Sequence, residues 1–321
     1  MSFASNARGE LARESCGQIC CARSELAAAL LSSGGISFRG LKRYALSLTS
    51  SDGAIVRRYF SLLKQFWGVT AQIRTLSADT LNGSVRYQLV IPEEHSLTLM
   101  GEMRLLDDGA LFGVRTVPDA ELTKLSCCKK SFLRGAFLMC GAVSNPEREY
   151  HIEIAAPNVE FAQFTVEIMN DFEIFAKIAC RKAKYVVYLK KAEEISDWLT
   201  LMGAGAAVLS LENVRIRKDV SNQVNRQMNC DSSNINRTMA AAESRIEDIR
   251  FLDREIGLDK LPKALRETAE ARLNNPDVSL TELGELLVPP LGKSGVNTRL
   301  RRLGELANRL RAGEETGLSS K

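Results

Sequence analysis

The chain has 321 residues and a formal net charge of +4, with 45% hydrophobic and 26% charged residues. This composition is typical of a globular protein with more than one domain, and it excludes collagen-like, disordered and disulfide-scaffold classes. The mild positive charge permits an anionic partner without requiring one. The sequence shows neither a basic-then-apolar leader nor an unbroken run of about 18 apolar residues. We therefore expect a cytoplasmic protein without a membrane partner.

The eight cysteines include two adjacent pairs, Cys20-Cys21 and Cys127-Cys128. In a reducing compartment they are expected to be free thiols. Adjacent cysteines differ from the Cys-x-x-Cys spacing of structural zinc sites, and the chain has only two histidines as further ligands. We therefore expect these thiols to pack as small hydrophobes near helix starts, with no metal and no cofactor.

An internal repeat organises the first two-thirds of the chain. Residues 20–37, CCARSELAAALLSSGGIS, recur at residues 127–144 as CCKKSFLRGAFLMCGAVS. The match continues beyond these residues, where YALSLTSSD at Tyr44 in the first copy pairs with YHIEIAAPN at Tyr150 in the second. A unit of about a hundred residues exceeds the roughly 20–50 residues of solenoid repeats. We therefore predict a duplicated small domain arranged as a pseudo-two-fold pair.

Each copy is predicted to be an α+β unit with an antiparallel sheet. In the first copy the expected elements are a helix at 20–33, a short strand within 35–42, strands at 44–49, 69–76 and 84–91, and helices at 53–67 and 93–106. In the second copy they are a helix ending near 141, strands near 150–156, 175–181 and 184–189, and helices at 159–171 and 192–202. Asp52 and Asn158 occupy N-cap positions.

A row of small residues marks the first helix of each copy. Ala28 and Ser32 form it in the first copy, and Gly135, Met139 and Ala142 hold the same positions in the second. Small residues let two helix backbones approach closely, so this row predicts that the two helices pack together.

Polar and basic side chains alternate with apolar ones along the predicted strands. The candidates for contact with phosphates or base edges are Arg74, Arg86, Lys177, Arg181 and Lys184. A solvated sheet face gives the same alternation, so the pattern alone leaves both interpretations open.

Residues 211–252 have helical spacing of apolar residues and are predicted to be a helical connector. Their other faces are rich in asparagine and arginine, although asparagine is a poor helix former. These side chains could contact DNA, but we favour an interpretation in which they cap turns around Asp231, Ser232 and Ser233.

The last segment has the layout of a helix-turn-helix. A helix at 262–273 is followed by Ser279 with Glu282, a capping-box pair, then by the turn VPPLGK and a helix capped by Ser294. That last helix has an apolar stripe, and its opposite face carries fork-shaped donors of the kind used to contact bases: Asn297, Thr298, Arg301 and Arg302. A three-helix bundle with a solvated arginine face is the alternative.

The repeated helix resembles the LAGLIDADG motif of homing endonucleases, carried here by AAALLSSG at 27–34 and RGAFLMCG at 134–141. The resemblance implies paired motif helices at a pseudo-dyad and a saddle of two sheets over the DNA major groove. In such nucleases an acid before the last glycine of each motif binds a divalent metal. Ser33 and Cys140 stand there instead, and neither offers a carboxylate oxygen to Mg²⁺. We therefore expect the fold and a DNA-binding saddle without catalysis.

A LAGLIDADG-like pair without acids, joined to a C-terminal helix-turn-helix, resembles the WhiA family of bacterial sporulation and cell-division regulators over almost the whole chain. The family implies a sequence-specific, nucleoid-associated transcription factor bound to double-stranded DNA at promoters, with a C-terminal part similar to the promoter-reading helix-turn-helix of sigma factors. On matched positions, most base and phosphate contacts are expected from Lys293, Ser294, Asn297, Thr298, Arg301 and Arg302.

The expected domains are two repeats at 1–106 and 107–210, a connector at 211–250 and the helix-turn-helix domain at 251–321. As an alternative, the saddle docks RNA polymerase or a sigma factor and only the last domain contacts DNA. A metal-dependent nuclease that recruits Glu25, Glu147 or Glu153 is a third hypothesis. Because a pseudo-dimeric half satisfies its own two-fold contact, we expect a monomer.

Overall fold

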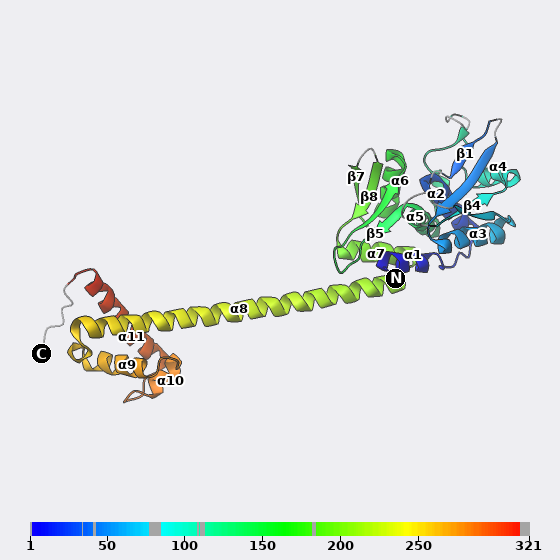
Figure 1. Cartoon of the computed structure of the whole chain (residues 1–321). Helices are drawn as coiled ribbons and strands as arrows, with labels where there is room; N and C mark the ends of the chain where they lie inside the picture. The colour runs from blue at the N-terminus through cyan, green and yellow to red at the C-terminus, as the bar shows by residue number, and fades with distance from the viewer. Residues whose placement is uncertain are drawn as a thin grey trace. The chain divides into compact units, whose positions relative to one another are not determined.

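The structure is a computed structural model that describes residues 2–33, 35–40, 43–76, 85–107, 109, 113–181 and 184–314. It divides into two compact units, Met1–Asp219 (unit 1) and Val220–Lys321 (unit 2), and the helix α8 (Gly205–Ile256) contributes to both (Figure 1). Across the described ranges, every helix falls short of the length and hydropathy that a membrane span requires.

The first repeat forms a four-stranded antiparallel sheet of order β1-β2-β4-β3 with its helices. Its elements are α2 (Ile19–Ser33), β1 (Ile36–Phe38), β2 (Tyr44–Ser50), α3 (Gly53–Trp67), β3 (Gln72–Leu76), β4 (Arg86–Ile91) and α4 (Glu93–Glu102). Asp52 caps α3 as predicted, its carboxylate accepting a 2.8 Å hydrogen bond from the amide of Ala54. The helix predicted to reach residue 106 ends earlier, because Arg104 adopts a left-handed φ of 50° that a helix does not allow.

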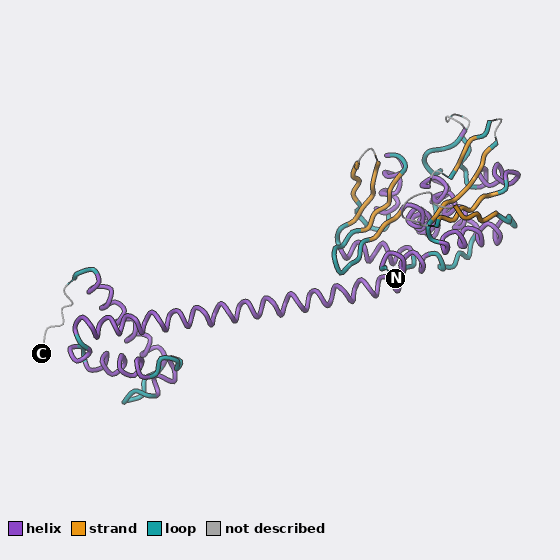
Figure 2. Tube along the Cα trace, in the orientation of Figure 1, coloured by secondary structure: helices purple, strands orange, loops and turns teal. Residues whose placement is uncertain are grey.

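The second repeat has the same topology, with strand order β5-β6-β8-β7. Its elements are α5 (Ser126–Cys140), β5 (Gly141–Val143), β6 (Ile152–Ala156), α6 (Val159–Asn170), β7 (Lys177–Arg181), β8 (Lys184–Leu189) and α7 (Ala192–Met202). Asn158 caps α6 by accepting a 2.7 Å hydrogen bond from the amide of Phe161. The predicted α+β fold with two antiparallel sheets is confirmed, and Figure 2 shows the two groups of strands in unit 1.

The helices α2 and α5 pack against each other between the two sheets of unit 1 (Figure 1). Ala28, in the predicted row of small residues, is fully buried. At Gly135 a Cβ atom would lie 2.3 Å from the carbonyl oxygen of Glu25, so even alanine would not fit. The predicted close approach of the two helix backbones is confirmed at this glycine.

A helix that the sequence analysis missed, α1 (Phe3–Leu11), lies at the start of unit 1. Its Arg8 side chain donates a hydrogen bond to the carbonyl oxygen of Gly141. Its Glu10 carboxylate accepts a 2.7 Å hydrogen bond from the amide of Ala206, in the first turn of α8. The local sequence is mixed and polar, and these two hydrogen bonds join α1 to residues more than a hundred positions away.

The predicted turn at Asp231, Ser232 and Ser233 is wrong, because these residues lie inside α8. The polar side chains bond along the helix instead of capping a turn. Gln227 donates to Asp231 at 3.1 Å and the Thr238 hydroxyl donates to the Asn234 carbonyl oxygen at 2.8 Å. Pairs spaced i, i+4 support the helix that the asparagines individually disfavour.

Unit 2 contains the end of α8, the short helix η3 (Leu258–Lys260), and the helices α9 (Lys263–Asn274), α10 (Leu280–Glu285) and α11 (Lys293–Arg311). Its core joins all four α-helices and consists of Ile249, Leu252, Leu261, Leu265, Ala269, Leu283, Leu287, Val296, Leu300, Leu303 and Ala307. The last turns of α8 are therefore part of this fold.

Candidate nucleic-acid interface

The helix α10 begins at the predicted capping box. The Ser279 hydroxyl accepts a hydrogen bond from the Glu282 amide at 3.3 Å, and the Ser279 amide donates to the Glu282 carboxylate at 2.8 Å. The hydrogen bonds from the Ser279 amide and hydroxyl lower the pKa of Glu282. This arrangement fixes where the first helix of the predicted helix-turn-helix starts.

The connection between α10 and α11 depends on Gly284. The amide of Leu291 donates a 2.9 Å hydrogen bond to the Gly284 carbonyl oxygen. A Cβ atom at Gly284 would lie 1.9 Å from the carbonyl oxygen of Leu291. Only glycine therefore lets the returning chain pack this closely on α10.

The helix α11 has one buried face and one exposed face. Its apolar stripe of Val296, Leu300, Leu303 and Ala307 is buried, as the sequence predicted. All six residues predicted to contact DNA are exposed on α11: Lys293, Ser294, Asn297, Thr298, Arg301 and Arg302. The helix carries six basic residues and one acidic residue. The exposed surface of α11 therefore carries more basic than acidic side chains.

Some of these side chains already have partners within unit 2. Arg301 lies 3.4 Å from the Glu305 carboxylate, and the Thr298 hydroxyl donates to the Ser294 carbonyl oxygen at 2.9 Å. The predicted cap at Ser294 is wrong: α11 starts at Lys293, two residues earlier than predicted, and Gly292 is its N-cap without a side-chain hydrogen bond. The Ser294 hydroxyl therefore does not cap α11, and Ser294 is exposed in the first turn of the helix.

Arg245 of α8 is a candidate that the sequence analysis missed. Its guanidinium donates a 2.7 Å hydrogen bond to the Asn297 side-chain oxygen. No local motif marks it, because its partner lies 52 residues later in the chain. Arg299 behaves in the opposite way: it lies in α11 but donates to the Ala264 carbonyl oxygen at 3.2 Å, so it fixes α11 to α9.

The saddle candidates of the first sheet, Arg74 and Arg86, are exposed and share one face. Directly opposite residues of an antiparallel pair point to the same side of the sheet. Arg74 lies opposite Gln88, and Arg86 lies opposite Leu76. Since Gln88 and Arg86 are two residues apart on β4, both arginines lie on the same face.

The saddle candidates of the second sheet, Lys177, Arg181 and Lys184, are also exposed, and an acid lies beside one of them. Arg181 lies opposite Lys184 in the register of β7 and β8. The Glu153 carboxylate lies 2.8 Å from His151 Nε2 and 3.7 Å from the Arg181 guanidinium. This carboxylate offsets part of the positive charge of the face.

The two positions that hold acids in homing endonucleases bond to backbone here. The Ser33 hydroxyl donates to the Ala29 carbonyl oxygen at 2.6 Å, within its own helix. The Cys140 thiol contacts the Ser32 carbonyl oxygen at 3.0 Å, across the α2–α5 interface. Burial raises the pKa of the Cys140 thiol, which keeps it protonated.

Each of the three acids that a metal-dependent nuclease could recruit in place of the missing motif acids has a basic partner. Glu25 is fully buried and bonded to Arg58 and Arg134. Glu147 pairs with Arg217. Glu153 pairs with His151 and Arg181, as described above. Carboxylates held by cations are poor ligands for Mg²⁺, which gives up its hydration water reluctantly and needs accessible oxygen atoms.

Three family models match this chain in the order of its segments. A WhiA N-terminal LAGLIDADG-like domain matches residues 19–106, a WhiA LAGLIDADG-like domain matches 129–221, and the WhiA C-terminal HTH domain matches 224–307. The chain belongs to the WhiA family. The resemblance inferred from the motifs is thereby confirmed, and so is the helix-turn-helix domain.

Curated relatives in the family are similar over the full length. A "Probable cell division protein WhiA" of Desulforamulus reducens is 43% identical over 315 residues, 98% of each chain. Another of that name from Macrococcus caseolyticus is 40% identical over 320 residues, 99% of each chain. The full-length WhiA structure from Thermatoga maritima has a TM-score of 0.59 at 23% identity, covering 96% of this chain and 99% of that one, which shows a shared fold.

Proposed function

We propose that this chain is a sequence-specific DNA-binding transcriptional regulator acting at promoters in cell division or sporulation, in which α11 enters the major groove. The observation that carries the proposal is the two-sided character of α11. Its apolar face completes the core of unit 2, while Lys293, Asn297, Arg301 and Arg302 cover its exposed face. A cytoplasmic, nucleoid-associated location and a monomeric state go with this function.

The side chains on α11 suit both kinds of DNA contact. Arginine can donate two hydrogen bonds to guanine and asparagine can pair with adenine, whereas lysine and serine at a helix N-terminus suit phosphate. Arg245 donates to the Asn297 side-chain oxygen, which leaves the NH₂ group of Asn297 available as a donor. Arg245 therefore orients Asn297 for base contact.

The proposal includes the absence of nuclease activity. Ser33 and Cys140 provide no carboxylate, and the nearby acids are bonded to basic side chains. A pair of metal ions needs acids from both motif helices to hold the attacking and leaving oxygens. The saddle of this chain therefore acts by binding.

A second candidate function for the saddle is to dock RNA polymerase or a sigma factor, with only unit 2 on DNA. The position of Glu153 favours it, because this carboxylate lies among the basic residues of the second sheet and would repel a phosphate. A mixed charge pattern suits a protein surface better than a nucleic-acid backbone.

The test uses the full-length chain and a promoter fragment recovered by chromatin immunoprecipitation. Arg301→Ala and Arg302→Ala should each weaken specific binding by about 1–3 kcal/mol, measured by fluorescence anisotropy at fixed salt. Arg266→Ala is the control, because Arg266 lies on α9 and pairs with Glu270. Equal affinity of the two α11 variants and the parent protein would contradict the assignment of the recognition helix.

The saddle is tested separately with Lys177→Ala and Lys184→Ala in the same full-length chain. If the saddle binds DNA, both substitutions reduce the salt dependence of binding, because fewer counterions are released. An unchanged salt dependence, with loss of polymerase or sigma-factor capture, would support docking.

A further inference from the structure

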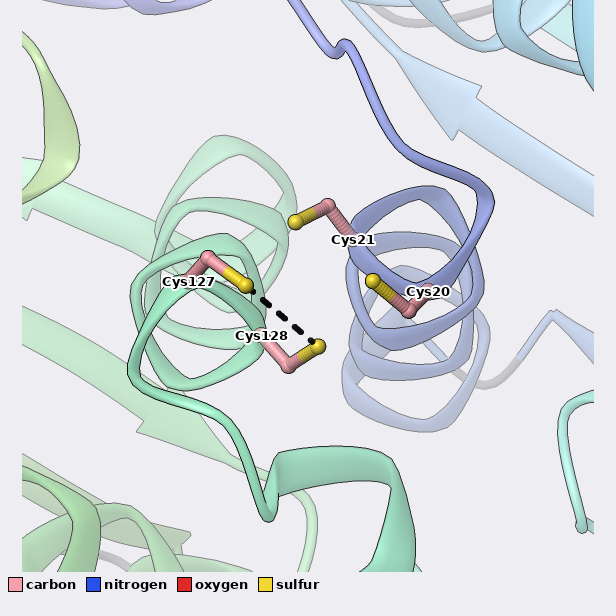
Figure 3. A group of neighbouring side chains, drawn as sticks. All are labelled: Cys20, Cys21, Cys127 and Cys128. Carbon is pink, nitrogen blue, oxygen red and sulfur yellow. Dashed lines mark hydrogen bonds between the residues drawn. The ribbon is translucent and has the colours of Figure 1, made fainter.

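Four cysteines meet where α2 and α5 begin. Cys20 and Cys21 come from the first turn of α2, and Cys127 and Cys128 come from the first turn of α5. Their Sγ atoms all lie within 4.8 Å of one another, and those of Cys127 and Cys128 are 4.0 Å apart. Figure 3 shows the four thiols turned toward one another across the two helices.

The duplication explains how adjacent cysteines reach this geometry. Each repeat contributes one Cys-Cys pair, and the packing of α2 on α5 places the two pairs across the pseudo-two-fold axis. The Ser24 hydroxyl fixes the register at this point by donating a 2.8 Å hydrogen bond to the Cys128 carbonyl oxygen. The two pairs can thereby place their four sulfur atoms at the corners of a tetrahedron, with each pair forming one of two opposite edges.

We propose that Cys20, Cys21, Cys127 and Cys128 bind one zinc ion as a tetrathiolate site that joins the two repeats. A zinc–sulfur distance of about 2.3 Å in a tetrahedron implies sulfur atoms about 3.8 Å apart. The thiols, at most 4.8 Å apart, reach that spacing by a contraction of about 1 Å. Side-chain rotation supplies a shift of this size.

The chemistry of the cluster favours a soft divalent cation over four free thiols. Thiolate sulfur is a soft ligand that suits zinc, and the thiols lose their protons as the ion binds. The two helix N-termini add positive potential beside the sulfur atoms.

The site is closed and structural in type. Four protein ligands leave no position for water or substrate, unlike a catalytic zinc site. The Gln18 side chain contacts two of the ligands, since its oxygen accepts from Cys20 at 3.4 Å and from Cys127 at 3.9 Å. Rotation of this amide would present its NH₂ group to the metal-bound thiolates, the support that metal ligands usually have.

The proposal is tested on full-length protein purified with a reductant and without chelator. We expect about one zinc per chain by mass spectrometry of the metal, and intense thiolate-to-cobalt absorption after exchange with Co²⁺. Cys127→Ser should lose both signals. Cys180→Ser and Cys230→Ser are matched controls, because these cysteines are exposed and outside the cluster, and both should retain the metal.

Two further measurements keep the test decisive if Cys127→Ser folds poorly. Cys127→His keeps a zinc ligand at that position and should restore zinc binding. A chelator should lower the melting temperature of the parent protein toward that of Cys127→Ser. The proposal is overturned by a parent protein with no more zinc than Cys127→Ser, or by a disulfide between cluster cysteines under reductant. DNA affinity does not enter this test, so the proposed regulatory function stands or falls separately.

Discussion

Glu25 holds a buried charge network at the α2–α5 interface. Its carboxylate is fully buried and accepts hydrogen bonds from Arg58 at 2.7 Å and from Arg134 at 3.2 Å. Arg134 also donates to the Met202 carbonyl oxygen, so the network links both repeats with α7. Removing the carboxylate would leave two buried guanidiniums without a counter-charge, which is the costly way to disrupt a buried pair.

At the residue scale, we predict that Glu25→Gln lowers the free energy of unfolding of unit 1 by about 3–5 kcal/mol. The measurement is urea denaturation, with a lower midpoint and an unchanged slope. Glu93→Gln is the control: it breaks the exposed pair with Arg43 and should leave the midpoint in place. A midpoint equal to that of the parent protein would show that Glu25 carries no net stabilising charge.

A second prediction at this scale concerns catalysis. Supercoiled plasmid incubated with the full-length protein and Mg²⁺ should remain uncut, because Ser33 and Cys140 provide no carboxylate ligand. Gel electrophoresis over time measures nicking. Robust cleavage that disappears in Glu153→Gln would reverse the conclusion and assign Glu153 as a metal ligand.

At the element scale, the connection between α10 and α11 sets where the exposed face of α11 lies. We predict that Gly284→Ala destabilises unit 2 by about 1–3 kcal/mol, because the new Cβ overlaps the Leu291 carbonyl oxygen. Thermal unfolding and DNA anisotropy measure the two effects. Gly292→Ser is the matched control, since a Cβ there meets no neighbouring atom and serine is a good N-cap. Equal losses in both variants would show that the close approach is not the cause.

At the same scale, Arg245 is expected to act through Asn297. Arg245→Ala should weaken specific DNA binding, and Asn297→Ala should do the same, whereas the double variant should lose little more than either one. This non-additivity follows if both changes remove the same oriented contact. A double-mutant cycle by anisotropy measures it. Fully additive losses would mean that Arg245 contacts DNA independently.

At the scale of the whole molecule, units 1 and 2 have separate hydrophobic cores. We therefore predict two unfolding transitions in calorimetry. Glu25→Gln should shift only the transition of unit 1, and Gly284→Ala only that of unit 2, because residues that share no partners act additively. A single transition shifted by both substitutions would contradict this independence.

Local chemistry was enough to predict much of this protein from its sequence. The N-caps Asp52 and Asn158 and the capping box at Ser279 mark helix starts because their bonds span only two or three residues. The stripe on α11 predicts its buried face because helical spacing alone places those side chains together. The repeat predicts two similar sheets, and Ser33 and Cys140 indicate the loss of the catalytic acids.

Contacts between distant parts of the chain required the tertiary structure. The cysteine cluster, the Glu25 network and the Arg245–Asn297 bond join residues between 33 and 109 positions apart. The helix α1 has no clear periodicity, and its Arg8 and Glu10 side chains bond to residues more than a hundred positions away. The physical reason is the same in each case. A short-range sequence pattern predicts which face of a helix or strand is apolar. Only the packing of two helices or strands decides which of their polar side chains meet.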